Sequence, residues 1–140
     1  MGKTVLITGG AGYVGSALVP SLLEDGYKVI VYDLYLFGDV FKNLKHENLI
    51  EIKGDIRDKE KLINAGKGAD YLIHLACISN DPSFELNPEL GKSINHDAFD
   101  NVIETLKANN MKRVVYASSA SVYGTQEGDV VETIKGIPLT

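Results

Sequence analysis

The chain has 140 residues, 44% of them hydrophobic and 24% charged, and its 14 basic and 19 acidic side chains give a formal net charge of −5 at pH 7. This length suits one globular domain, and the ordinary apolar content excludes a disordered tail. There is no basic excess to neutralise nucleic-acid phosphates, and the lone Cys77 cannot form an intramolecular disulfide or by itself a zinc site. The apolar runs are shorter than the roughly 20 residues that a membrane helix needs, and residues 1–10 lack the long apolar region of a signal peptide. We therefore expect no nucleic-acid partner, no membrane contact, no metal and a cytoplasmic setting.

Short apolar runs alternate with helical patterns along the chain. The β-branched run at residues 3–8 predicts a strand buried on both faces, and residues 13–25 predict a helix that bends at Pro20 and ends at Gly26. Further strands are expected at 28–33, 48–53, 70–76 and 112–118, with a short helix at 58–65 and an irregular segment at 34–47. A long amphipathic helix is predicted by apolar side chains that recur every four residues, at Leu90, Ile94, Ala98, Val102 and Leu106.

The alternation of strands and helices predicts βαβ units and a parallel sheet. With right-handed crossovers, the result is an α/β fold of the Rossmann type. We expect a doubly wound sheet of about five strands in the order 3-2-1-4-5, with helices on both faces. No sixth strand is predicted, so residues 1–140 are expected to form one domain that lacks the C-terminal part of such a fold.

The strongest local signal is the glycine-rich run TGGAGYVG at residues 8–15, which lies between a predicted strand and a predicted helix. Gly9 permits a sharp turn, Gly12 lets the backbone approach a pyrophosphate, and Gly15 lets helix and strand pack closely. Free amides at the start of the helix, together with the helix dipole, favour an anion. The alternative interpretation is a tight turn with a structural role only.

An acidic residue follows where a dinucleotide site needs one. Asp33 ends the second predicted strand, where a carboxylate accepts hydrogen bonds from both hydroxyls of an adenosine ribose and repels a 2′-phosphate. No lysine or arginine lies in 34–41 to bind such a phosphate. The sequence therefore predicts NAD as the cofactor, with a solvated aspartate at a strand end as the alternative.

These residues and several further motifs resemble the extended short-chain dehydrogenase/reductase family, in its nucleotide-sugar epimerase/dehydratase branch. The motifs span essentially the whole chain and are TGxxGxxG at 8–15, Gly54-Asp55-Ile56, His74-Leu75-Ala76, Asn95 and YASSASVYG at 116–124. The resemblance implies a cofactor site made of Gly9, Gly12, Tyr13, Val14, Gly15, Asp33, Asp55, Ile56, Leu75, Ala76, Cys77, Asn95 and Ser118. In that site Asp55 and Ile56 contact adenine, residues 75–77 form a wall under the pyrophosphate and nicotinamide ribose, and Asn95 braces the active site from the long helix.

Four residues also have plainer interpretations. Cys77 is expected to be a buried small apolar side chain and not a nucleophile. Asn95 has the alternative role of bonding only to neighbouring backbone. His74 is predicted to be a satisfied core histidine, because no second histidine or cysteine stands at ligand spacing. Tyr123 is assigned to the turn after the fifth strand and not to catalysis.

The resemblance also implies the chemistry. Ser119 hydrogen-bonds the sugar hydroxyl that is oxidised, a tyrosine takes the proton, a lysine four residues later lowers the pKa of that tyrosine, and NAD takes the hydride. None of the seven tyrosines of this chain has a lysine four positions on. We therefore expect an N-terminal portion of a longer enzyme, without its base and its substrate lobe, that is itself inactive.

The residues after the fifth strand bear on the type of reaction. Dehydratases of this branch carry an Asp-Glu pair where this chain has Ala120-Ser121, and the decarboxylase subgroup carries a glutamate at the position of Ser121. The predicted function is therefore the NAD-binding part of a nucleotide-sugar 4-epimerase-like enzyme. A dehydrogenase/reductase of the same family and a non-catalytic NAD-binding sensor or scaffold are the alternatives. The expected partners are a nucleotide sugar, which the 79–91 loop borders, and a second copy in a homodimer.

Overall fold

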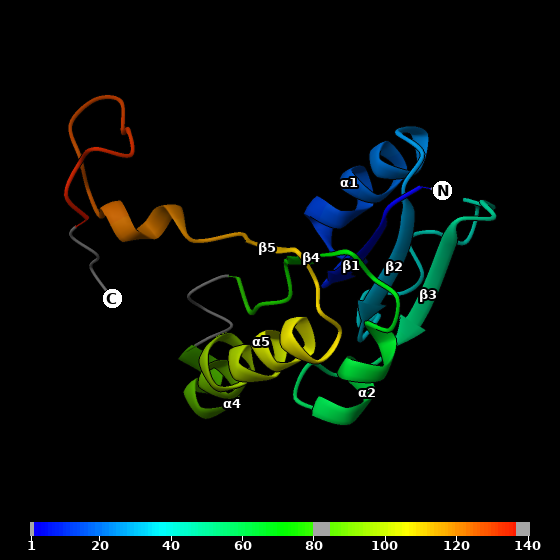
Figure 1. Ribbon diagram of the computed structural model, residues 1–140. Helices are drawn as coiled ribbons and strands as arrows, with labels where there is room; N and C mark the ends of the chain where they lie inside the picture. Colours follow the sequence, from blue (N-terminus) through cyan, green and yellow to red (C-terminus); the bar gives the residue numbers. More distant parts are fainter. Residues whose placement is uncertain (1, 80–84, 137–140) are drawn as a thin grey trace.

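The computed structural model describes residues 2–79 and 85–136. It contains one parallel sheet of five strands in the order β3-β2-β1-β4-β5, as the sequence predicts (Figure 1). The strands are β1 (Thr4–Thr8), β2 (Lys28–Asp33), β3 (Leu49–Lys53), β4 (Tyr71–His74) and β5 (Arg113–Tyr116). Thr8 pairs with Tyr32 on one side and with His74 on the other, so the carboxyl ends of the central strands lie level at one edge of the sheet.

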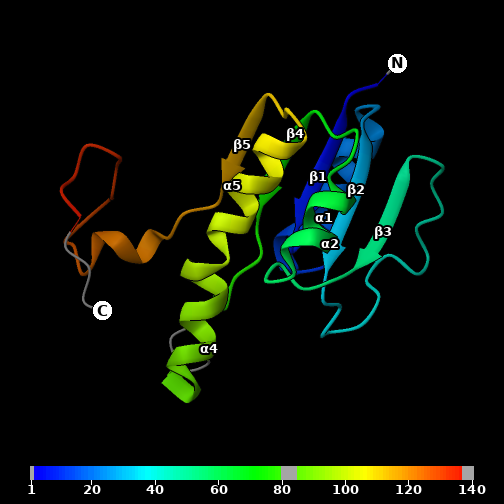
Figure 2. The ribbon, with the colours of Figure 1, turned by 60° about the horizontal axis from the view of Figure 1, so that its bottom comes forward.

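Helices cover both faces of the sheet, which confirms the doubly wound arrangement. The helix α1 (Tyr13–Glu24) lies on one face, and α2 (Lys59–Ala65) and α5 (Phe99–Ala108) lie on the other (Figure 1). The short helix α4 (Pro88–Lys92) precedes α5. Figure 2 shows α4 and α5 nearly end to end, with α5 beside β4 and β5 and α4 extending beyond the ends of the strands. No helix within residues 2–79 and 85–136 is both long and apolar enough to cross a membrane.

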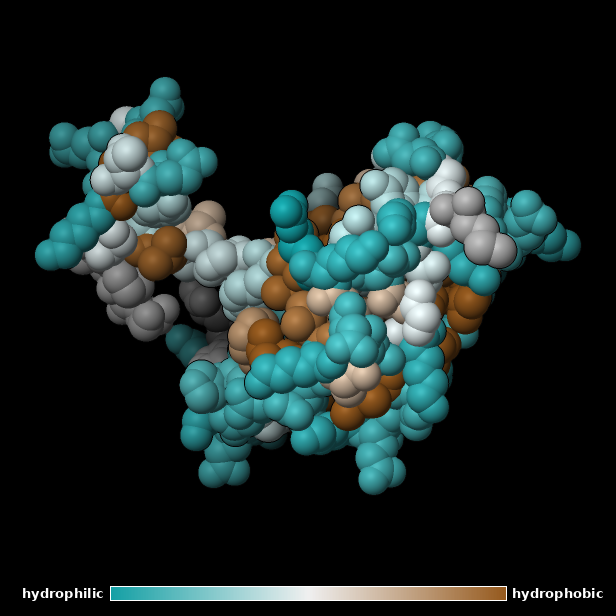
Figure 3. All heavy atoms as spheres, in the orientation of Figure 1, coloured by the Kyte–Doolittle hydropathy of each residue, from teal (hydrophilic) through white to brown (hydrophobic). Residues whose placement is uncertain are grey.

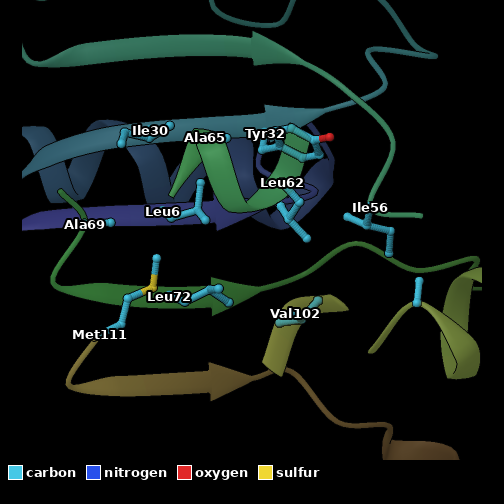
Figure 4. Packing of buried hydrophobic residues seen from close by; sticks show 11 residues of the cluster. Leu6, Ile30, Tyr32, Ile56, Leu62, Ala65, Ala69, Leu72, Val102 and Met111 are labelled. Atoms are coloured by element: carbon cyan, nitrogen blue, oxygen red, sulfur yellow. The ribbon is translucent and has the colours of Figure 1, made fainter. Parts of the chain in front are cut away.

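Side chains that alternate along β1 divide the core into two layers. Leu6 points toward α2 and α5, where it packs with Ile30, Leu62, Leu72 and Val102 (Figure 4). Val5 and Ile7 point the other way and pack under α1 with Val19, Leu23, Val29 and Val31. All three of these β1 side chains are at most 2% exposed. The strand is thus buried on both faces, as a parallel strand covered by helices on each side must be.

The end of α1 follows the prediction at Gly26. Gly26 has a φ of +82°, its amide donates to Leu23 O, and the amide of Tyr27 donates to Leu22 O. These two bonds form a Schellman motif, which satisfies the last carbonyls of the helix. Pro20 does not interrupt α1, which runs as one helix from Tyr13 to Glu24.

The predicted long helix at 90–106 is wrong in one respect. A π-helical segment, η1 (Ser93–Asp97), stands between α4 and α5, and the amide of Ala98 donates to Ser93 O at 3.1 Å, five residues back. A recurrence of four residues is compatible with both α- and π-helical turns in so short a window, so periodicity alone does not separate them. The prediction of buried Ala98 and Val102 is confirmed, at 2% and 0% exposure.

The segment after β5 differs from the rest of the molecule. Residues 117–136 leave the sheet and extend away from it, through a short 3-10 helix η2 (Ala120–Tyr123) (Figure 1). Figure 3 shows this segment as a lobe that stands off from the packed body. No residue from 112 to 136 is buried.

Candidate functional site

A cavity of about 770 Å³ opens at the carboxyl edge of the sheet. Its walls come from the segments that follow β1, β2, β3, β4 and β5. Clefts outside the carboxyl ends of parallel strands are where open α/β sheets bind ligands. Most of the predicted cofactor residues line it, namely Gly9, Gly12, Tyr13, Val14, Asp33, Asp55, Ile56, Leu75, Ala76, Cys77 and Ser118. The predicted Gly15, Asn95 and Ser119 are not among the residues that line it.

Two glycines of the loop between β1 and α1 are required by the close approach of backbone segments. Gly9 has a φ of +73°, and a Cβ there would overlap the amide nitrogen of Ala76 after β4. A Cβ at Gly15 would overlap the carbonyl oxygen of Gly10. Gly15 therefore lets α1 pack against the loop's own backbone, two residues beyond the strand end. Only a glycine fits either position without moving the neighbouring chain.

The first turn of α1 presents backbone amides to the cavity. Gly12 is the N-cap and makes no side-chain cap bond, and Tyr13 and Val14 line the cavity with side chains that are 96% and 57% exposed. Within the described part of the chain, no acceptor bonds the amides of Tyr13, Val14 or Gly15. Unpaired amides at the positive end of a helix dipole favour an anionic group such as a phosphate.

Asp33 joins the glycine loop to the segment after β2. Its Oδ2 accepts from the amide of Ala11 at 2.9 Å and its Oδ1 accepts from the amide of Tyr35 at 2.8 Å. A carboxylate offers about four lone-pair sites, so both oxygens can accept further bonds from a ligand. Asp33 lines the cavity, and its two hydrogen bonds fix both loops.

An apolar wall after β2 was missed by the sequence analysis. Leu34, Leu36, Phe37 and Val40 line the cavity, and Leu36 and Phe37 are 76% and 93% exposed. Large apolar side chains that are so exposed beside a cleft are unusual and suit a flat aromatic group of a ligand. The signal available in the sequence was four apolar residues in a segment without helical or strand periodicity.

The segment after β3 is held by bonds from three directions. The hydroxyl of Tyr32 donates to Asp55 O at 2.9 Å, and Asn101 Nδ2 on α5 donates to Ile56 O at 3.1 Å. The Nε of Arg57 donates to both carboxylate oxygens of Asp55, at 3.0 and 3.1 Å. These bonds hold the pKa of the Asp55 carboxyl below its usual value. Burial raises the pKa of Tyr32 to about 12, so its hydroxyl stays protonated and able to donate.

The wall after β4 carries Leu75, Ala76 and Cys77. The prediction that Cys77 is buried is wrong: its side chain is exposed at the cavity surface. The strand ends at His74, so Cys77 follows the turn of the chain toward the cavity and not the alternation of the strand. Partial desolvation raises the pKa of the thiol above its usual value, which does not favour a reactive thiolate.

Asn95 acts from η1 on the backbone next to this wall. Its Oδ1 accepts from the amide of Ile78 at 2.8 Å, and its Nδ2 donates to the carbonyl oxygen of the same residue at 2.9 Å. The side chain thus binds neighbouring backbone, which was the alternative role. Because Ile78 itself lines the cavity, this bonding also holds the cavity wall.

His74 is a core histidine, as predicted. It is 2% exposed, its Nδ1 lies 2.6 Å from Thr8 Oγ1, and its ring stacks on Tyr116 with centroids 5.6 Å apart. Burial lowers the pKa of the imidazole, so the ring is neutral at pH 7. No three His, Cys, Asp or Glu side chains come together as metal ligands in the described part of the chain.

Ser118 and Ser119 are placed differently, although they are neighbours. Ser118 lines the cavity, whereas the Oγ of Ser119 accepts from the amide of Ser121 at 3.1 Å and caps η2. Tyr123 belongs to the same short helix, in agreement with its assignment to a turn. In the predicted substrate loop 79–91, residues 80–84 lie outside the described residues.

Known proteins resemble this chain in sequence and fold. The sequence profile of the NAD dependent epimerase/dehydratase family matches residues 5–139. UDP-glucose 4-epimerase 2 of Oryza sativa is 33% identical over 138 residues, which cover 88% of this chain and 33% of that protein.

Two solved structures superpose closely. The UDP-N-acetylglucosamine 4-epimerase of Methanobrevibacter ruminantium, in complex with UDP-N-acetylmuramic acid, has a TM-score of 0.87 and 34% identity, covering 99% of this chain and 45% of that chain. The Thermus thermophilus UDP-glucose 4-epimerase complex with NAD has a TM-score of 0.84 and 28% identity, covering 96% and 44%. The chain therefore spans less than half the length of these proteins.

Proposed function

The chain belongs to the NAD dependent epimerase/dehydratase family, and we propose that it is the NAD-binding part of a nucleotide-sugar 4-epimerase-like enzyme. One observation carries the proposal. The amides of α1, the carboxylate of Asp33 and the apolar wall at Leu36 and Phe37 line the same cavity. A dinucleotide presents a pyrophosphate, a ribose diol and a flat base to a protein, and these three kinds of wall match them.

The residues present fit NAD by their chemistry. The space left by Gly9 and Gly15 keeps the loop against the sheet and the start of α1 open to a pyrophosphate. The carboxylate of Asp33 suits a free ribose diol, and no lysine or arginine in 34–41 suits a 2′-phosphate. When bound, NAD supplies a hydride acceptor at its nicotinamide ring.

The chain's own residues would hold and orient NAD and the sugar. Proton transfer also needs a general base, which these residues do not supply. Ser119 is the proposed hydroxyl that bonds the reacting sugar hydroxyl, and Ser118 stands at the cavity before it. None of the seven tyrosines is followed four residues later by the lysine that the catalytic tyrosine of this family requires. We infer that residues 1–140 bind NAD and do not by themselves convert a sugar.

The residues of η2 favour epimerisation over elimination of water. Ala120 and Ser121 begin this helix, and neither side chain has a carboxyl group for acid–base work. A dehydrogenase/reductase of the same family would use the same cavity and is the second candidate. A non-catalytic NAD sensor is the third. A tyrosine followed four residues later by a lysine, encoded directly after Thr140, would favour an enzyme over a non-catalytic sensor.

The proposal is tested by titrating the 140-residue chain with NAD and with NADP by calorimetry. We expect NAD to bind at least tenfold more tightly, because the 2′-phosphate would face Asp33 with no cation beside it. Equal or tighter binding of NADP would contradict the assigned cofactor.

The assignment of Ser119 is tested in a longer enzyme that contains residues 1–140. There, Ser119→Ala should lower turnover by about 10²–10⁴ and leave NAD affinity nearly unchanged, since the hydroxyl acts on the sugar. Thr125→Ala is the control, because Thr125 is an exposed hydroxyl residue of the same segment and does not line the cavity. Normal turnover in the Ser119 variant would mean that this residue is structural. The cytoplasmic setting and the homodimer stay predictions.

A further inference from the structure

A residue with a strained backbone stands at the base of the apolar wall that follows β2. Tyr35 has a φ of +54°, and within the described part of the chain Asn110 is the one other non-glycine residue with a positive φ. Asn110 follows the end of α5, a place where asparagine commonly adopts this conformation. A left-handed backbone is disfavoured for a tyrosine, so contacts elsewhere in the fold must hold Tyr35 in it.

The amide, the hydroxyl and the ring of Tyr35 are held by different parts of the structure. The amide donates to Asp33 Oδ1 at 2.8 Å, and the hydroxyl donates to Glu51 Oε1 on β3 at 3.0 Å. The ring packs against the core layer under α1, which contains the buried Val31 and Phe41. Burial and the bond to Glu51 raise the pKa of the hydroxyl, so it remains a donor at neutral pH. The side chain therefore anchors this segment to the sheet.

The backbone of Tyr35 also begins the turn that carries the apolar wall. The amide of Gly38 donates to Tyr35 O at 3.2 Å, so residues 35–38 form a β-turn with Leu36 and Phe37 at its centre. These two side chains line the cavity, whereas Tyr35 does not. Because Leu36 and Phe37 are 76% and 93% exposed, they have little packing of their own to fix them. Their position depends on the residue at which the turn begins.

We propose that Tyr35 is a positioning residue, whose anchored side chain holds a left-handed backbone and thereby presents Leu36 and Phe37 to the adenine of the cofactor. This inference rests on the proposed binding of NAD. Without the anchor, residue 35 should relax to a negative φ and turn the two apolar side chains away from the cavity. Only molecules with the presented turn would then bind, and the apparent affinity would fall by their fraction.

The first test compares Tyr35→Ala with Tyr35→Gly in the 140-residue chain. Both variants lose the anchor, but glycine adopts a positive φ readily and alanine does not. Tyr35→Ala should weaken NAD and AMP binding by about tenfold, and Tyr35→Gly should bind both nucleotides about fivefold more tightly than Tyr35→Ala. If the tyrosine contributed packing alone, the glycine variant would bind as weakly as the alanine variant or more weakly. That result would overturn the proposal.

Tyr27→Ala is the matched control for these affinities. Tyr27 is a partly buried tyrosine that packs against the same core layer, but it precedes β2, has no positive φ and does not line the cavity. Its removal should leave NAD affinity nearly unchanged. An equal loss of affinity in Tyr27→Ala and Tyr35→Ala would assign the effect to general weakening of this layer and would overturn the positioning role.

The second test is made without nucleotide. The chain has no tryptophan, so Phe37→Trp places a single fluorescent reporter at the centre of the turn. With Tyr35 intact, acrylamide should quench this indole efficiently, because the side chain at position 37 is 93% exposed. Adding Tyr35→Ala should lower the quenching constant by about half, since a released turn lets the indole pack on apolar surface. Adding Tyr27→Ala should leave the constant unchanged.

The two tests separate the positioning role from the identity of the cofactor. Unchanged quenching on addition of Tyr35→Ala would overturn the positioning role even if the chain binds NAD. If the unmodified chain fails to bind NAD, the proposed cofactor falls, and the quenching measurement still decides whether Tyr35 holds the turn.

Discussion

The central strands and the β5 edge belong to the same sheet but are packed very differently. β1 and β2 have helices on both faces, and their inner side chains from Val5 to Ile7 and from Val29 to Tyr32 are at most 5% exposed. β5 is covered on one face only, with Val115 and Tyr116 each 52% exposed, and no described strand pairs with its outer edge. The segment that follows β5 has no buried residue.

This difference coincides with a division of roles. The glycine loop, Asp33 and the segments after β3 and β4 all come from the packed region, and together they line the cavity. Ser119, the proposed catalytic hydroxyl, comes from the unpacked segment and only caps a short helix. A site needs supporting contacts to hold its geometry, so the cofactor site should be formed within this chain and the catalytic site should not.

The largest expected effect comes from truncating one apolar side chain in each of the two regions, a buried leucine and an exposed valine. Leu72→Ala removes a side chain that is 0% exposed and should lower the free energy of unfolding by about 2–5 kcal/mol. Val131→Ala removes one that is 52% exposed and should change it by less than about 0.5 kcal/mol. Urea unfolding followed by circular dichroism measures both. Similar losses would mean that the C-terminal segment is packed in solution.

Two glycines with a positive φ allow the packed region and the C-terminal segment to be compared directly. Gly9→Ala should lower the free energy of unfolding by about 3 kcal/mol. About 1–2 kcal/mol comes from the left-handed backbone and about 1–3 kcal/mol from the overlap with Ala76. The same variant should abolish measurable NAD binding. Gly128→Ala, at φ +90° with nothing near its Cβ, should cost about 1 kcal/mol and leave NAD binding unchanged. Unfolding and calorimetric titration test both variants. Retained NAD affinity in Gly9→Ala would contradict the assigned loop.

A smaller loss of NAD affinity is expected from removing the carboxylate at the end of β2, and a second acidic residue in the segment after β2 serves as its control. Asp33→Ala should weaken NAD binding about 10–100-fold, since charge-assisted hydrogen bonds contribute about 1.5–3 kcal/mol. Asp39→Ala is the control, because Asp39 bonds the amide of Phe41 and does not line the cavity. Fluorescence titration gives both affinities. An equal loss in the two variants would assign the effect to loop structure and not to the ribose contact.

The smallest effect concerns pH and His74. Burial lowers the pKa of the folded imidazole, whereas the unfolded chain has a pKa of about 6.5. The unfolded state therefore binds more protons as pH falls below about 6.5, and stability should be complete above that pH and decrease below it. In His74→Gln this part of the pH dependence should disappear between pH 7 and 5. An unchanged slope in that variant would show that other groups cause it.

The sequence predicted the parts of the molecule that depend on local chemistry. The strand order follows from alternating elements, and the positions of Gly9 and Asp33 at the cavity follow from a glycine-rich motif between a strand and a helix and from an acidic residue at the end of the next strand. Features set by tertiary contacts were missed. The π-turn at Ser93 keeps the same apolar recurrence as an α-helix, and Phe37 belongs to a segment with no periodicity. The exposure of Cys77 depends on how the chain turns after β4, which no local pattern specifies.

The central claim is that the packed region holds the cofactor on its own. An amide NMR titration of the 140-residue chain with NAD tests it most directly, because each backbone amide reports separately. We predict saturable shifts at residues 9–15, 33–37, 55–57 and 75–78, with residues 120–136 unchanged. Shifts confined to 120–136, or no shift at 9–15 at saturating NAD, would contradict the account.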